Sequence, residues 1–295
     1  MLKNSTHLVT AYGALLICLD MIRYNEQMKL QNKTAIVTGA AQGIGKALAI
    51  AFKDQGAQVV ASDLLAEQIN ATAQEIGVTG IGCDVTNETD IQNLVSATEK
   101  EYGPVDLFCS NAGVFYGQPD HAASADNNTW QKCWEIHVMS HVYAARAVLP
   151  SMIERGQGYL LQMASAAGLL NQIGDAAYST TKHAAVGFAE SLAITHGDDG
   201  IKVSVICPQY VATPMLGYKE GDQIEEYKGL ITTEQVAQTV VTGIDKEQFL
   251  ILPHAEVEQY IKLKAGDYDR WLGGMRKLRR KIGNSVPQDI HKLMG

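Results

Sequence analysis

Residues 34–45 read TAIVTGAAQGIG, and this stretch decides the fold. An apolar run of strand length, Ala35–Thr38, leads straight into three glycines at positions 39, 43 and 45. A helical pattern begins at residue 44, so the turn offers close backbone approach and the free N–H groups of a helix N-terminus. The stretch predicts a βα unit that binds a pyrophosphate; a purely structural turn is the alternative. The residues expected to contact the ligand are Gly39, Gln42, Gly43, Ile44 and Gly45.

Short apolar runs alternate with longer helical patterns along the rest of the chain. The predicted strands are Ala35–Thr38, Val59–Ser62, Gly80–Cys83, Val105–Ser110, Gly158–Met163, Lys202–Ile206 and Phe249–Leu252. The predicted helices are 44–55, 64–76, 88–102, 126–155, 176–196, 233–243 and 255–283. This alternation predicts an α/β fold, doubly wound and Rossmann-type, with a parallel sheet of about seven strands. No Pro- or Gly-rich linker divides residues 28–295, so we expect one domain with a C-terminal helical tail over 255–295.

Composition excludes several classes of function. The chain has 295 residues and a net charge of -8, which disfavours nucleic acid as a partner because phosphate binding needs a basic face. The five cysteines are scattered and never form a CxxC pair, which argues against a disulfide framework or a metal site. We therefore expect no metal and a cytoplasmic location. The basic run 276–281 is interpreted as a solvated helix face.

The N-terminus contains an apolar run at residues 8–19. This run is too short to predict a membrane span, and it lacks a clear cleavage site for a signal peptide. We interpret residues 1–27 as an N-terminal extension of uncertain order. A membrane tether through this run is the alternative, but a membrane partner is not expected.

Acidic and small residues follow the next three predicted strands. Asp63 ends the second strand, where a carboxylate accepts hydrogen bonds from ribose hydroxyls and repels a 2′-phosphate. No Arg or Lys stands beside it, which favours NAD over NADP; a surface Asp that caps the next helix is the alternative. Other expected cofactor contacts are Asp84 and Val85 near the adenine and Asn111, Ala112 and Gly113 near a ribose.

The candidate catalytic pair is Tyr178 and Lys182, which share one helix face at positions i and i+4. An ammonium and a cationic nicotinamide are expected to lower the pKa of the phenol, so that Tyr178 serves as a general acid or base. Ser165 follows the fifth strand and is expected to donate a hydrogen bond to the substrate oxygen.

A second YxxxK motif, Tyr260 to Lys264, serves as an internal control. Tyr178 has Ser165 thirteen residues upstream, whereas the corresponding position for Tyr260 is Glu247. Tyr260 also falls in a late helix, far from the predicted ligand edge. We therefore predict a structural role for Tyr260.

Together these motifs resemble the short-chain dehydrogenase/reductase family over about residues 33–253. The motifs are TGAAQGIG at 38–45, Asp63, Asp84-Val85, NAG at 111–113, Ser165, YSTTK at 178–182 and PQYVAT at 208–213. The resemblance implies hydride transfer between NAD and a secondary alcohol or ketone, and a homotetramer or homodimer. It implies that Tyr178 is the acid/base, Ser165 the oxyanion donor, and Lys182 a ribose ligand that also modifies the pKa of the phenol. Pro208, Val211 and Thr213 would contact the nicotinamide.

Two positions depart from the family pattern. His137 stands where the family has an asparagine that helps to hold a water beside the lysine. A histidine either holds such a water through a ring nitrogen or is merely packed; both remain open. Gln209 follows Pro208 where the family usually has glycine.

The substrate is predicted to be a small apolar alcohol or ketone. The candidate walls are apolar or aromatic, namely Val114, Phe115, Tyr116, Leu169, Leu170, Tyr210 and Met215. Such walls suit an aliphatic, alicyclic or steroid-like compound. A catalytically weak or inactive NAD-binding sensor on the same fold is the alternative, and the His137 replacement is its best support.

Overall fold

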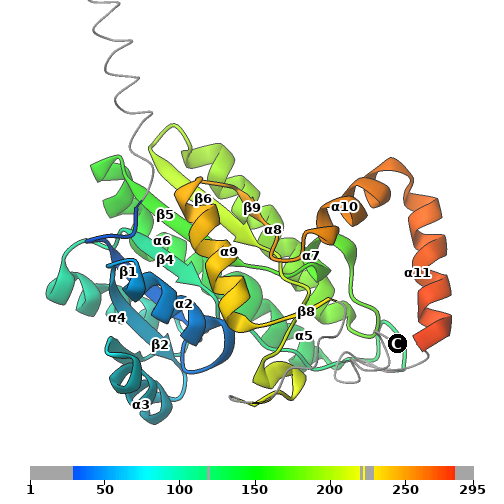
Figure 1. The fold of residues 1–295 in the computed structure, drawn as a ribbon, viewed down its shortest axis with the longest axis horizontal. Helices are drawn as coiled ribbons and strands as arrows, with labels where there is room; N and C mark the ends of the chain where they lie inside the picture. The colour runs from blue at the N-terminus through cyan, green and yellow to red at the C-terminus, as the bar shows by residue number, and fades with distance from the viewer. Residues whose placement is uncertain (1–28, 118–119, 220–221, 223–228, 283–295) are drawn as a thin grey trace, which may run out of the picture.

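The computed structural model describes residues 29–117, 120–219, 222 and 229–282, so the predicted extension 1–27 lies outside the described residues. Seven parallel strands form one sheet in the order β3-β2-β1-β4-β5-β6-β9 (Figure 1). The strands are β1 Thr34–Thr38, β2 Gln58–Asp63, β3 Thr79–Gly82, β4 Leu107–Ser110, β5 Gly158–Met163, β6 Ile201–Ile206 and β9 Leu250–Ile251. All seven predicted strands and the Rossmann-type order are thus confirmed.

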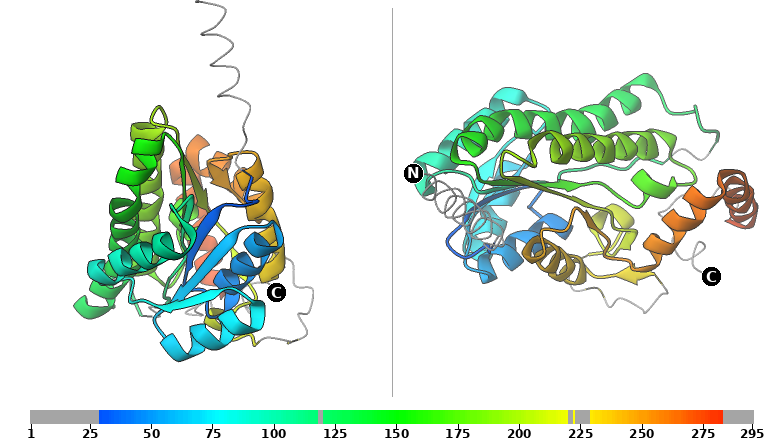
Figure 2. Two further views of the ribbon diagram at one scale, coloured as in Figure 1. Left: turned by 90° about the vertical axis from the view of Figure 1, so that its left-hand side faces the viewer. Right: turned by 90° about the horizontal axis from the view of Figure 1, so that it is seen from above.

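Helices cover both faces of the sheet (Figure 2). The longer helices are α2 Gly43–Asp54, α3 Ala66–Ile76, α4 Glu88–Tyr102, α5 Asn127–Trp134, α6 Ser140–Arg155, α8 Ala176–His196, α9 Thr233–Asp245, α10 Glu256–Gly266 and α11 Tyr268–Ile282. One core cluster joins α2, α3 and α9 to one face, and another joins α4, α6 and α8 to the other. Because both faces of the sheet are covered, the central strands β1, β4 and β5 are buried at every position.

Two predicted helices are interrupted. The helix expected over 126–155 contains a π-helical turn, η1 Glu135–Met139, in which the Ser140 N–H bonds to the Glu135 carbonyl. The helix expected over 255–283 breaks at Asp267, whose side chain caps α11 by accepting from the Arg270 N–H (2.9 Å). Both differences arise from local bonds that the apolar periodicity does not encode.

Small elements missed by the prediction lie beside the ligand edge. They are α7 Ala167–Leu170, the 3₁₀ turn η2 Pro214–Leu216, and the short parallel strands β7 Tyr210–Val211 and β8 Leu230–Ile231. β7 and β8 have two residues each and do not belong to a longer apolar run such as Phe249–Leu252, which marks β9, so apolar periodicity does not identify them.

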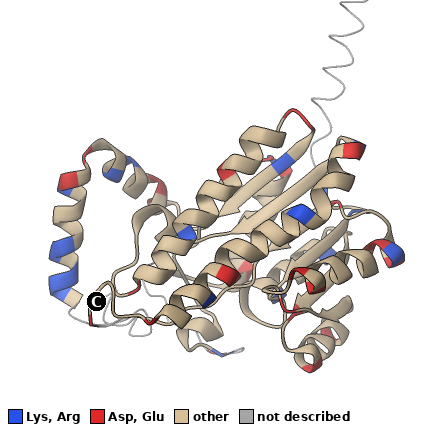
Figure 3. Ribbon diagram, turned by 180° about the vertical axis from the view of Figure 1, so that it is seen from behind, with Lys and Arg blue, Asp and Glu red and all other residues tan. Residues whose placement is uncertain are grey.

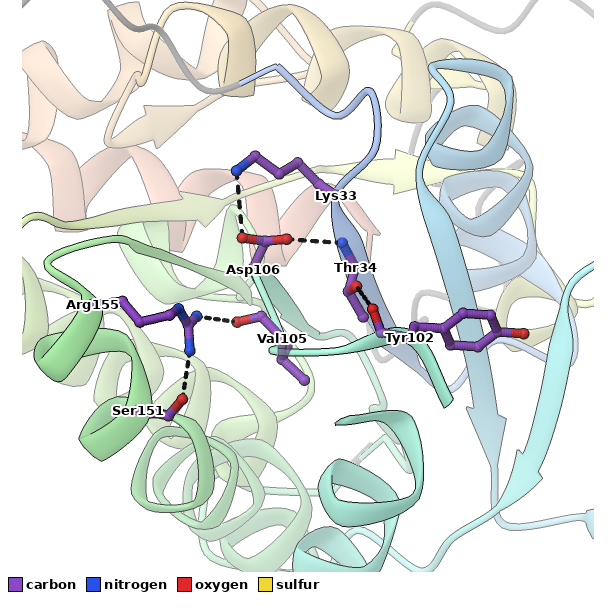
Figure 4. A network of polar contacts seen from close by, with 7 residues as sticks. All are labelled: Lys33, Thr34, Tyr102, Val105, Asp106, Ser151 and Arg155. Carbon is purple, nitrogen blue, oxygen red and sulfur yellow. Dashed lines mark hydrogen bonds and ion pairs between the residues drawn. The ribbon is translucent and has the colours of Figure 1, made fainter. Parts of the chain in front are cut away.

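A polar network closes the opposite edge of the sheet, where the strands begin (Figure 4). Asp106 accepts from the Thr34 N–H (3.0 Å) and pairs with Lys33 (3.4 Å). Arg155 at the end of α6 donates to the Val105 carbonyl (2.9 Å). These side chains are engaged in joining β1, β4 and α6, so they stabilise the sheet on the side away from the ligand edge.

The C-terminal arm, α10 and α11, extends away from the layered part of the molecule (Figure 1). Lys and Arg residues are concentrated toward the end of α11 (Figure 3), and residues 276–281 are all exposed. The basic run therefore lies on an exposed part of α11, and its interpretation as a solvated helix face stays a prediction. Within the ranges that the structure describes, no helix is both long enough and apolar enough to cross a membrane.

Candidate active site

A cleft of about 470 Å³ opens at the carboxyl ends of the strands. The seventeen sequence-predicted cofactor and catalytic residues other than His137 all line it. They are Gly39, Gln42, Gly43, Ile44, Gly45, Asp63, Asp84, Val85, Asn111, Ala112, Gly113, Ser165, Tyr178, Lys182, Pro208, Val211 and Thr213. Residues that the sequence reading missed here include Leu64, Leu65, Thr86, Ile136 and Gln172. These carry no motif, and only the fold brings them to the cleft.

The glycine turn has a backbone shape that other residues rarely adopt. Gly39 and Gly43 have φ values of 63° and 60°, in the left-handed region. Gly45 lies so close to the turn that a Cβ there would meet the Gly39 carbonyl oxygen at 2.1 Å. Gln42 caps α2 without a side-chain bond in the described structure, so the first N–H groups of the helix face the cleft.

Asn111 joins the glycine turn to the end of β4. Its amide donates to the carbonyls of Thr38 (2.9 Å) and Gly39 (3.1 Å). Asp63 supports the same turn from β2, because its carboxylate accepts from the Ala41 N–H (3.1 Å). The carboxylate also lines the cleft, at the predicted place for a ribose.

Tyr178 is held between two rings at the N-terminal end of α8. The phenol makes edge-on contacts with Phe115 (centroids 5.4 Å apart, 80°) and His137 (5.4 Å, 88°). Lys182 lies one helical turn further on, with Nζ 5.7 Å from the centre of the phenol ring. Its ammonium is buried and donates to the Met163 carbonyl (2.9 Å). Ring packing and this bond fix both predicted side chains in place.

Burial dominates the ionisation of this pair. It raises the pKa of Tyr178 to about 12, opposed by the neighbouring Ser165 hydroxyl. It lowers the pKa of Lys182 to about 8. In the protein itself, desolvation of the phenolate outweighs the effects that favour it, and the predicted influence of a bound nicotinamide stays a prediction. Tyr178 is therefore a protonated phenol at neutral pH.

Ser165 lies just beyond β5, at the wall of the cleft. Its hydroxyl accepts from the Ala167 N–H at the start of α7 (3.1 Å) and donates a long bond to the Pro208 carbonyl (3.5 Å). Because the donated bond is long, the same hydrogen can turn toward a substrate oxygen. Ser165 and Tyr178 thus present two hydroxyl donors to one region of the cleft.

His137 is fully buried in the π turn and does not line the cleft. Its Nε2 accepts from the Val114 N–H (3.1 Å), so Nδ1 carries the proton and donates to Thr181 Oγ1 (2.9 Å). Burial, followed by the charge of Lys182, lowers the pKa of His137 well below 6.5, so the ring is neutral. Of the two roles left open by the sequence, these contacts favour packing, since protein groups use both ring nitrogens.

His141 lies one turn beyond His137 and was missed by the sequence reading. It is fully buried, and burial followed by the charge of Lys182 lowers its pKa to about 3. The Gln162 side chain lies beside the ring and partly opposes this fall in pKa. The sequence shows His137 and His141 at positions i and i+4, on one helix face. Nothing in the sequence, however, indicates that this face lies near Lys182.

Asp175 was also missed, although an Asp three residues before a helical Tyr is an N-cap signal. Its carboxylate accepts from the Tyr178 N–H (2.9 Å) and from the Gly117 N–H (3.0 Å). The side chain is 2% exposed. It therefore joins the start of α8 to the loop that carries Phe115.

We expect Asp175→Ala to lower the free energy of unfolding by about 1–3 kcal/mol, because a helix cap is lost and a buried N–H is left unpaired. Urea unfolding measures this change. Asp126→Ala is the matched control, since Asp126 caps the exposed start of α5 by accepting from the Thr129 N–H (2.7 Å), and its loss should be smaller. Equal effects at both sites would contradict the bridging role of Asp175.

The predicted substrate walls divide into two groups. Val114, Phe115, Tyr210 and Met215 line the cleft, whereas Tyr116, Leu169 and Leu170 are not among the residues that the structure places there. Leu169 and Leu170 instead pack beneath the C-terminal arm, against Val257 and its neighbours. The arm is distant in the chain from residues 165–170, which read SAAGLL. The sequence of this segment therefore does not indicate that the arm packs on it.

Tyr260 belongs to the C-terminal arm. Its ring packs against Trp271 (centroids 6.4 Å apart), and Lys264 donates to the Leu169 carbonyl (2.5 Å). Neither side chain is among the residues that line the cleft. The second YxxxK pair thus fastens α10 to α7 and α11.

Comparison with known proteins agrees with this geometry. The model of the short chain dehydrogenase family matches residues 33–224. The 1-deoxy-11-beta-hydroxypentalenate dehydrogenase of Streptomyces exfoliatus is 31% identical over 252 residues, which cover 83% of this chain and 90% of that protein. The mitochondrial borneol dehydrogenase of Lavandula x intermedia is 30% identical over 231 residues, with coverage of 77% and 88%.

The fold is also found among solved structures. A short chain dehydrogenase/reductase from Burkholderia phymatum, solved in complex with NAD, superposes with a TM-score of 0.74 at 24% identity. The match covers 82% of this chain and 96% of that one. The family match over residues 33–224, the relatives of 30–31% identity and the cleft geometry lead to one conclusion: this chain belongs to the short chain dehydrogenase family.

Proposed function

We propose that the protein is an NAD-dependent oxidoreductase that interconverts a secondary alcohol and a ketone. One observation carries the proposal: Ser165, Tyr178 and Lys182 line the same cleft as the glycine turn. A dinucleotide on the turn and a substrate at the two hydroxyls would therefore share one space. The resemblance to the family further supports a cytoplasmic homotetramer or homodimer.

The residues present suit a nicotinamide dinucleotide. A Cβ on Gly39 or Gly45 would fill the turn, and the N–H groups at the start of α2 are available to a pyrophosphate. Asp63 would hold the adenosine ribose, Asp84 and Val85 the adenine, and Val211 and Thr213 the nicotinamide amide. When bound, the cofactor supplies the atom that accepts or donates the hydride.

Tyr178 would transfer the proton that accompanies hydride movement. In ketone reduction its protonated phenol donates to the carbonyl oxygen; in alcohol oxidation the phenolate accepts the hydroxyl proton. Ser165 would donate a second hydrogen bond to the same oxygen and stabilise its developing charge. Lys182, whose pKa is about 8, is mainly cationic at neutral pH and would stabilise the phenolate.

His137 would act as a positioning residue. It contacts the phenol ring edge-on and bonds to Val114 and Thr181, so it links the loop after β4 to α8. This role needs no free ring nitrogen. The sensor alternative rested on the replacement at this position, and since the observed contacts are compatible with catalysis, we retain no second function.

The substrate is proposed to be an aliphatic, alicyclic or steroid-like alcohol or ketone. Val114, Phe115, Met215 and Leu216 give the cleft apolar lining, and Phe115 contacts Tyr178. Relatives are named as dehydrogenases of a hydroxypentalenate, of borneol and of a 3beta-hydroxysteroid. Such compounds would place one hydroxyl at Ser165 and Tyr178 and bury the remainder against the apolar wall.

A panel of secondary alcohols and ketones tests the proposal. Purified protein should form NADH from NAD with at least one apolar alcohol, and should consume NADH with the matching ketone. Phosphorylated sugars should be poor substrates because the wall is apolar. Absence of turnover across the panel, by protein shown to be folded and to bind NAD, would contradict the proposal.

Asp63→Ala should weaken NAD binding by about tenfold and relax the exclusion of NADP, because the variant loses hydrogen bonds to the ribose and a charge that repels a 2′-phosphate. Binding of both cofactors by calorimetry checks this. Asp63→Asn is the companion variant: it removes the charge but keeps the size of the side chain and an oxygen to accept from Ala41. Unchanged NAD affinity in Asp63→Ala would rule out the ribose contact.

A further inference from the structure

We propose that His254 is a positioning residue that holds the rim of the active-site cleft, and that it acts through backbone bonds without touching substrate or cofactor. His254 lies between β9 and α10 and is 3% exposed. It belongs to none of the motifs identified in the sequence. The proposal rests on the proposed oxidoreductase function, because the rim it holds is the expected nicotinamide and substrate wall.

The imidazole makes three bonds to the backbone of two separate segments. Its Nδ1 accepts from the Gln209 N–H (3.0 Å). Its Nε2 lies 3.1 Å from the carbonyl of Tyr210 and 3.1 Å from that of Gly229. Because Nδ1 accepts, Nε2 carries the proton and donates to both carbonyls. One ring therefore joins the residues that open and close the stretch 209–229.

The joined segments need this support. Tyr210–Val211 and Leu230–Ile231 pair as two-residue strands, and an isolated two-stranded pair is marginal in water. The Ala212 N–H bond to the Ile231 carbonyl (2.9 Å) extends the pairing by only one step. The buried ring of His254 bonds to the backbone where each of the two strands begins, and so it fixes their register. A buried histidine ring loses little conformational entropy when it makes these bonds.

The segment held in this way forms one side of the cleft. Residues from Pro208 to Leu216 that line it include Val211 and Thr213, the expected nicotinamide contacts, and Tyr210 and Met215, part of the substrate wall. Burial lowers the pKa of His254 below 6.5, so the ring stays in the neutral form that these bonds require. Loss of the ring should therefore displace the wall while Ser165, Tyr178 and Lys182 keep their own supports.

Three variants separate the bonds. His254→Phe keeps the ring volume and removes all three bonds. His254→Asn retains an acceptor near Nδ1 for the Gln209 N–H, and His254→Gln retains a donor near Nε2 for the two carbonyls. His196→Gln is the matched control, because His196 bonds to Asp199 at the far end of α8.

The first readout is hydrogen exchange, which does not depend on activity. In His254→Phe, amides in peptides covering 209–219 should exchange about tenfold faster or more, with peptides from β5 and α8 unchanged. The exchange rates of these amides in His254→Asn and His254→Gln should lie between those of His254→Phe and those of the wild type. Wild-type exchange rates over 209–219 in His254→Phe would overturn the proposal. If His254→Phe does not fold, wild-type exchange rates over 209–219 in both His254→Asn and His254→Gln would overturn the proposal instead.

The second readout is kinetic. His254→Phe should raise the KM for the alcohol by about tenfold, with a smaller change in kcat, because the wall moves and the Ser-Tyr-Lys set does not. An equal loss of kcat in all three variants, with KM unchanged, would overturn the positioning role. A wild-type protein that turns over no alcohol would refute the proposed function, and the exchange experiment would still decide the role of His254.

Discussion

Tyr178→Phe is expected to lower kcat by about 10²–10⁴-fold, which is the range that a positioned acid or base contributes. The substitution removes one oxygen and keeps the ring that packs against Phe115 and His137. NAD affinity and the free energy of unfolding should therefore change little. Steady-state rates of alcohol oxidation and ketone reduction, measured with the same substrate pair, provide the test.

The chain offers its own control for this substitution. Tyr260→Phe makes the same chemical change in the second YxxxK motif, whose ring packs against Trp271 in the C-terminal arm. We expect wild-type kinetics from it. If Tyr178→Phe retained near-native rates, or if both variants lost activity equally, proton transfer by Tyr178 would be wrong.

Gly45→Ala is expected to have the largest effect on the fold and on cofactor binding. The added Cβ would lie 2.1 Å from the Gly39 carbonyl oxygen and 2.6 Å from the Asn111 amide nitrogen. Since the first contact is with backbone, the turn itself must shift. We expect a loss of at least about 3 kcal/mol in the free energy of unfolding, or failure to fold, together with loss of NAD binding.

Gly187→Ala is the control for that prediction. Gly187 lies in α8, and no heavy atom of the described structure outside its own helix turn lies within 4 Å of a Cβ there. Alanine at an open helical position should stabilise the protein by about 0.5–1 kcal/mol. Thermal unfolding of the two variants should therefore shift in opposite directions; a Gly45→Ala protein as stable as the wild type would contradict the geometry of the turn.

The sequence was sufficient to predict the sheet because the strands are buried on both faces. Ala35–Thr38 and Gly158–Met163 are mainly apolar and buried at every position, and the intervening helices carry the complementary pattern. The glycine turn and the Tyr178 pair were also predictable, since each depends on residues close together in the chain. Tyr260 shows the limit of this reasoning: only its position relative to the other motifs separates it from Tyr178.

What the sequence did not predict depends on contacts between distant segments. The bonds of His137 to Val114 and Thr181 span 23 and 44 residues. The bond between His254 and Gln209 spans 45 residues. The raised pKa of Tyr178 has the same origin, because desolvation depends on everything that packs around the phenol. Local spacing carries no information about such neighbours.

The most direct test of the account follows the hydride itself. A secondary alcohol found to be a substrate is labelled with deuterium at its carbinol carbon and incubated with NAD and the wild-type protein, and the cofactor is then analysed by mass spectrometry. Direct transfer between two ligands in one cleft predicts NADH that carries the deuterium, and Tyr178→Phe should form it far more slowly. NADH without deuterium, or an equal rate of labelling in Tyr178→Phe, would contradict hydride transfer assisted by Tyr178.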